Sequence, residues 1–88
     1  MKKIVEVTEV QGEGLKSLLG QNVLLFCLNY IYTGKLAGIN ETCVLLESPS
    51  IVYETGAFSE SIYKDAQRLH TNTWYIQRSA IESFGRGK

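Results

Sequence analysis

Apolar residues fall into short runs along the chain, separated by polar segments that contain Gly, Asn or Pro. This spacing predicts strands joined by turns. The run 23–28 is apolar on both strand faces, which a strand needs only where other elements cover it on each side. After a tight turn at 29–30, the segment 31–39 alternates and places on one face Tyr32, Gly34, Leu36 and Gly38. Glycine weakens a strand, so two on one face predict a bend at a barrel corner.

A short helix is predicted before these strands, over about 13–20. Leu15, Leu18 and Leu19 share one helical face, and Gly20 is a natural helix end. Further upstream, segment 4–10 mixes β-branched and charged residues, which fits a short exposed strand or an extended arm.

The second half of the chain predicts more strands around a long polar segment. A strand begins at 43–47 and can resume at 51–53, because Pro49 requires a break or a sheet edge. Segment 54–72 shows no clear period, although a short helix over 59–69 is compatible with it, and it is interpreted as a long excursion. Strands at 74–76 and 80–84 follow, joined by a turn at 77–79.

Length and charge limit the classes of function. The 88 residues suffice for one domain over 1–88, and a core this small gains from subunit assembly. Nine basic and nine acidic residues give a formal net charge of zero, so any nucleic-acid binding must be local. The N-terminal residues lack the apolar core of a signal peptide or a membrane span, so we expect a cytoplasmic protein without membrane contact.

The reactive side chains do not form a recognisable catalytic or metal-binding pattern. Cys27 and Cys43 lie inside apolar runs and are expected to be buried free thiols. His70 lies in a polar segment, with no third group suggested that would orient it toward a cysteine. We therefore expect no enzyme activity, no metal and no cofactor.

The segments 18–23 and 32–40 resemble the first signature of the Sm/LSm family, which includes bacterial Hfq-type RNA chaperones. The likeness runs from 15 to 48: a leucine-rich helix ends at Gly20, an aromatic-x-Gly-x-Leu pattern follows, and Asn40 precedes an apolar strand. Segment 76–84 resembles the second signature more loosely, and 54–72 matches nothing in the family pattern. The resemblance implies a mainly β fold, with a short N-terminal helix and a five-stranded, strongly bent antiparallel Sm-like (SH3-like) barrel.

The resemblance also implies a homo-oligomeric ring that binds single-stranded RNA, or DNA, through two loops at its pore. The nucleic-acid contacts would come from Asn40, Thr42, Gln77, Arg78 and Ser79. The edges that join subunits would carry Trp74, Tyr75, Ile76, Ile81 and Phe84. The chain departs from the family in lacking an aromatic residue in its first loop, and Cys43 stands where many members carry Asn.

Each of these assignments has a structural alternative. Arg78 can be a solvated turn residue or an intersubunit ion-pair partner, and a one-residue slip would bring Gln77 to the pore instead. Asn40 can simply cap its own turn. The neutral charge and the missing loop aromatic also fit a protein-interaction or structural ring that has lost RNA binding, in which Glu41 or Glu82 would neutralise Arg78.

Overall fold

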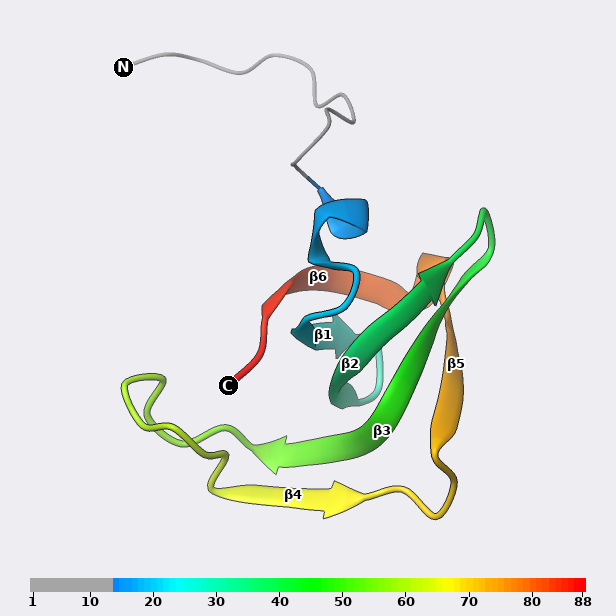
Figure 1. Cartoon of the computed structure of the whole chain (residues 1–88). Coiled ribbons are helices and arrows are strands. Elements are labelled where there is room, and N and C mark those ends of the chain that lie inside the picture. Colours follow the sequence, from blue (N-terminus) through cyan, green and yellow to red (C-terminus); the bar gives the residue numbers. More distant parts are fainter. Residues whose placement is uncertain (1–13) are drawn as a thin grey trace, which may run out of the picture.

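The strands of this protein form one antiparallel sheet (Figure 1). The structure is a computed structural model that describes residues 14–88. These residues form six strands: β1 (Asn22–Cys27), β2 (Ile31–Ile39), β3 (Cys43–Glu54), β4 (Asp65–Arg68), β5 (Thr73–Gln77) and β6 (Ile81–Arg86). The order is β4-β3-β2-β1-β6, and β5 also pairs with β3. The mainly β prediction is confirmed, but the sheet has six strands rather than five and is not closed, because β5 and β6 do not pair.

The core lies between the inward faces of β1, β2, β3 and β5. Its buried members are Leu15, Val23, Leu25, Leu36, Val44, Leu46 and Ile76. Leu24, which lies between two core residues of β1, is also buried. The prediction that the run 23–28 is covered on both faces is therefore confirmed for its first three residues, whereas Leu28 at its end is 74% exposed.

The predicted bend lies at Gly34, where β3 forms a bulge. Thr33 pairs with Ser50 and Lys35 pairs with Glu47, so two residues of β3 stand opposite Gly34 alone. The first of them, Ser48, has a left-handed φ of 51°, and the second, Pro49, is buried. The bulge accommodates the proline inside a paired strand, so β3 runs unbroken from Cys43 to Glu54. The expected interruption at Pro49 is therefore wrong.

The strands β4 and β5 lie along the same side of β3, one after the other (Figure 1). Residues 69–72 connect the two strands, and a backbone hydrogen bond at each end of this connection keeps the chain against β3. Leu69 N donates to Pro49 O at 2.9 Å, and Ser48 N donates to Asn72 O at 2.9 Å. The excursion expected over 54–72 is thus partly a strand. No helix forms over 59–69.

The helix expected over about 13–20 is reduced, within the described residues, to a four-residue 3-10 helix, η1 (Leu15–Leu18). Backbone hydrogen bonds explain why it ends there. Gly20 N donates to Leu36 O at 2.8 Å, and Leu36 N donates to Gln21 O at 2.9 Å. These bonds attach the chain to β2 directly after the helix, so it cannot continue. Segment 4–10 lies outside the described residues.

A second 3-10 helix, η2 (Arg78–Ala80), joins β5 to β6 and occupies the turn predicted at 77–79. The helices found over 14–88 are too short to cross a membrane.

Candidate nucleic-acid interface

The turn between β2 and β3 is organised by Asn40. Its side-chain oxygen Oδ1 accepts hydrogen bonds from the backbone N of Thr42 and of Cys43, each at 2.8 Å. The Thr42 hydroxyl donates to the same oxygen at 3.1 Å, and the Cys43 thiol lies 3.5 Å from it. Asn40 therefore caps its own turn, which is the structural role considered for it from the sequence. Its oxygen is fully used within the turn, which leaves its side-chain NH₂ group as the one available to a ligand.

Arg78, at the start of η2, fastens this turn to the chain segment that follows β5. Its backbone N donates to Thr42 O at 2.8 Å, and its Nη1 donates to Asn40 O at 2.9 Å. Two segments 38 residues apart in sequence thus form one surface. Thr42 O thus holds the backbone of Arg78, and Asn40 O takes one of the five N–H donors of its guanidinium, so most of these donors stay available.

An open hollow of about 610 Å³ lies on this surface. It is lined by Glu41, Thr42, Cys43, Tyr75, Gln77, Arg78 and Ser79. Four of the five predicted nucleic-acid-binding residues line it, and the fifth, Asn40, shapes the turn beside it. The structure therefore brings the predicted site residues together.

Charge in the hollow is mixed. Within residues 14–88, Arg78 forms no ion pair with Glu41 or Glu82, the two carboxylates that could neutralise it. Glu41 is exposed, however, and lines the same hollow. The surface thus offers one cation with free donors and one carboxylate near it.

Tyr75 adds an aromatic ring to the hollow. It was expected at a subunit interface; in the single subunit its side chain is 68% exposed and lines the hollow beside Arg78. Its neighbours Trp74 and Ile76 point into the core, so strand alternation turns Tyr75 outward. That alternation was readable in the sequence, whereas the closeness of β5 to the 40–43 turn was not. An aromatic ring is therefore present at the site, supplied by a strand instead of the first loop.

The predicted subunit interface divides into core and exposed residues. Ile76 is only 5% exposed and belongs to the core, while Trp74 and Ile81 are half-buried and pack against it. Tyr75 and Phe84 (45%) are exposed. Within residues 14–88, β5 pairs only with β3 and β6 only with β1, so each strand keeps one edge without a partner strand.

A second open hollow of about 310 Å³ lies at the unclosed side of the sheet. It is lined by Cys27, Leu28, Asn29, Tyr30, Tyr32, Trp74, Tyr75, Ile76, Gln77 and Ala80.

The two cysteines, Cys27 and Cys43, are free thiols that are half-buried, less buried than expected. Burial raises the pKa of the Cys27 thiol, which disfavours the reactive thiolate. Within 14–88 no cluster of three or more potential ligands for a metal ion occurs.

The chain was compared with protein-family models, with curated proteins and with solved structures, and no match was found.

Proposed function

We propose that this chain is an Sm-like subunit of a homo-oligomeric ring that binds single-stranded RNA, or DNA, at the surface formed by the 40–43 turn and the segment 75–79. Such a protein would act in RNA or DNA processing or chaperoning in the cytoplasm, without catalysis. The observation that carries the proposal is the pair of hydrogen bonds from Arg78 to Thr42 O and Asn40 O. They build one surface from the two segments that the family resemblance implies as nucleic-acid loops.

The chemistry of this surface supports binding of a single strand. Arg78 has donors left for a phosphate or a base, and Tyr75 presents an exposed ring on which a base can stack. One such pair per subunit binds weakly, and the chain has no net positive charge to add to it. A ring would repeat the pair around its axis, so that the weak contacts combine by multivalency.

The sheet topology supports the ring. The order β6-β1-β2-β3-β5, preceded by the short helix η1, is the arrangement expected of an Sm-like barrel, with β4 as an additional strand beside β3. Among the strands of 14–88, β5 and β6 each keep one edge without a partner strand, and such an edge is a template for pairing with another chain. If β5 of one subunit pairs with β6 of the next, the free edges are satisfied around a closed ring.

The proposal is tested by fluorescence anisotropy of labelled oligo-U, oligo-A and a single-stranded DNA, each at low and moderate salt. We expect salt-sensitive binding that Arg78→Ala weakens, since phosphate contacts release counterions. The matched control is Arg68→Ala, because Arg68 is an exposed arginine of β4 with one side-chain bond to Asn72, at 3.2 Å. Equal affinity of the two variants would contradict the proposed site.

The alternative is a protein-interaction or structural ring of the same fold. The observation that favours it is Glu41, whose carboxylate lines the hollow of Arg78 and would repel phosphates. This alternative predicts that no oligonucleotide binds at low salt, although the protein still forms its oligomeric ring. Glu41→Gln separates the two functions further: it should strengthen nucleic-acid binding at this surface and leave a scaffold ring unchanged.

A further inference from the structure

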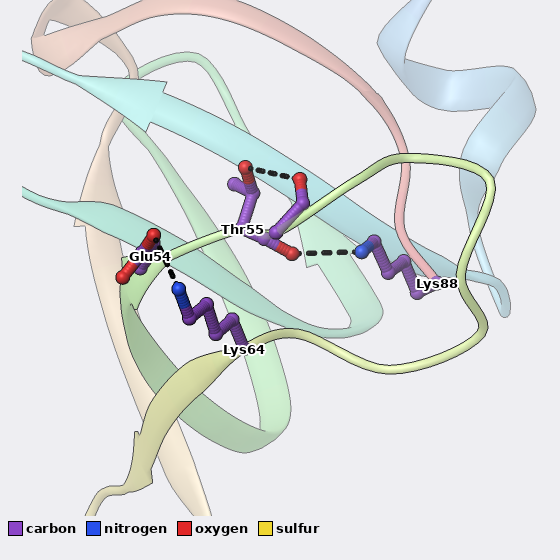
Figure 2. Close-up of polar contacts among 5 residues, drawn as sticks. Glu54, Thr55, Lys64 and Lys88 are labelled. Carbon is purple, nitrogen blue, oxygen red and sulfur yellow. Dashed lines mark hydrogen bonds and ion pairs between the residues drawn. The ribbon is translucent and has the colours of Figure 1, made fainter.

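Lys88, which follows β6, extends its ammonium group into the loop between β3 and β4 (Figure 2). Its Nζ donates to three backbone carbonyls of that loop: Thr55 O at 2.8 Å, Ala57 O at 2.9 Å and Ile62 O at 2.9 Å. An ammonium group has three N–H donors. All three are therefore satisfied by one loop of the same chain.

Two aromatic rings stand beside the same ammonium. Nζ lies 5.0 Å from the ring centroid of Tyr63 and 5.6 Å from that of Phe58. Both distances are within the range in which a cation is attracted by the negative face of a ring. We call the three carbonyls and the two rings the ammonium cage.

The backbone that leads to the cage is fitted closely to the protein. Gly87 N donates to Asn22 O at 2.9 Å, and Lys88 N donates to the Tyr63 hydroxyl at 2.9 Å. A Cβ on Gly87 would lie 3.0 Å from both Val23 O and the Tyr63 hydroxyl. Only glycine fits this position without a shift of its neighbours.

The loop holds part of its polar backbone itself and leaves one carbonyl to Lys88: Glu60 N donates to Ala57 O at 3.0 Å and Lys64 N to Thr55 O at 3.4 Å. Residues 55–64 lie outside the sheet ladder, and Ile62 O accepts a hydrogen bond only from Lys88 within the described part of the chain. Phe58 and Ile62 are largely exposed, so apolar packing does not hold this loop in place. The ammonium adds three hydrogen bonds that tie the two ends of this loop to the chain after β6.

We propose that the 55–63 loop is a receptor for a primary ammonium group, that Lys88 fills it from within the same chain, and that this contact is a latch joining the loop to β6. The ligand class follows from the donor count. Three converging carbonyls match a group with three N–H donors, whereas the planar guanidinium of arginine presents its donors in a fork and a quaternary ammonium has none.

A second lysine lies next to the cage without entering it. Lys64 belongs to the same loop region, yet its Nζ pairs with Glu54 at 3.3 Å on the exposed surface (Figure 2). Glu54 and Glu60 line an open hollow in this loop and make it attractive to cations. Lys64 thus provides a matched control with the same charge, next to the cage but outside it.

The first test measures how fast each lysine amine is acylated in the intact protein, by mass spectrometry after brief exposure to an acylating reagent. Because the three N–H groups of Lys88 are engaged, we expect its amine to react about tenfold more slowly than that of Lys64. Equal rates would overturn the latch. Gly87→Ala, which disturbs the approach to the cage, should remove the protection of Lys88.

The second test measures hydrogen–deuterium exchange of segment 55–64. Lys88→Ala should speed this exchange about tenfold, while Lys64→Ala should leave it unchanged. Adding n-butylammonium to the Lys88→Ala protein should restore slow exchange, whereas tetramethylammonium and potassium ions should not. Unchanged exchange in Lys88→Ala would overturn the latch. Absence of rescue, or rescue by all three cations alike, would overturn the receptor for a primary ammonium.

Discussion

Gly34 and Pro49 face each other at the bend of the sheet, so closely that a side chain on Gly34 would have no room. A Cβ there would lie 3.3 Å from the Cα of Pro49 and 2.9 Å from the backbone oxygen of Glu47. Both contacts are with backbone atoms, which cannot move aside as a flexible side chain can. The bulge in β3 and the glycine in β2 therefore require each other.

Gly34→Ala should lower the free energy of unfolding by about 1–3 kcal/mol, because the added methyl group overpacks the bend. The matched control is Gly38→Ala in the same strand, where a Cβ would meet Leu45 at an ordinary 3.6 Å. Urea denaturation compares the two variants. If Gly38→Ala proved as destabilising as Gly34→Ala, the close approach to Pro49 would not be the cause.

The stability of the protein should fall at alkaline pH. Burial raises the pKa of the Cys27 thiol, so the folded protein keeps this proton at pH values where the unfolded chain has lost it. The free energy of unfolding then decreases as pH rises above about 8.5, the ordinary thiol pKa. The pKa of Tyr32 is also raised, mainly by burial, and adds a further decrease above about pH 10.

Urea unfolding between about pH 7.5 and 9.5 isolates the thiol contribution. Cys27→Val should flatten the decline, because it removes the thiol whose pKa is raised. A decline of the same size in Cys27→Val would show that another group is responsible.

Phe84→Glu should disperse the proposed ring without unfolding the subunit, because this side chain on β6 is already 45% exposed. Light scattering coupled to size exclusion should show a wild-type mass several times the subunit mass of 9.9 kDa, and a variant close to that mass. Tyr53→Glu is the control, as an exposed aromatic residue of β3 away from β5 and β6. A monomeric wild type would contradict the ring. Ile76 is unsuitable for this test, since a charge in the core would unfold the subunit.

Tyr75→Ser should weaken oligo-U binding about tenfold, since loss of one stacked base costs about 1–3 kcal/mol. It should leave stability nearly unchanged because the ring is largely exposed. Tyr53→Ser is the control for loss of an exposed tyrosine. Equal affinities of the two variants would show that Tyr75 does not contact the nucleic acid.

The sequence predicted the elements whose signals are local. The apolar run of β1, the alternation of β2 and the turn before β6 all follow from residue type and period. The continuity of β3 through Pro49 could not be predicted, because it depends on Gly34 in another strand. β4 was missed for a different reason: its four residues are all exposed, so it pairs through its backbone and leaves no apolar pattern.

The residues of the candidate site could be predicted from the sequence, but the contacts that bring them together could not. A family resemblance pointed to Asn40, Thr42 and the segment 77–79. The Arg78 hydrogen bonds that unite them span 38 residues and have no sequence signal. The same is true of Lys88, whose partners lie in a loop with no recognisable motif.

The most direct test of the account is photo-crosslinking of iodouracil-labelled oligo-U to the wild-type protein, followed by mapping of the modified peptide. If a single strand binds at this surface, crosslinks are expected at Tyr75 or within the adjoining segment 76–79, and they should be lost in Arg78→Ala. Crosslinks confined to the 55–64 loop, or no crosslink at low salt, would contradict the claim that this surface binds a single strand.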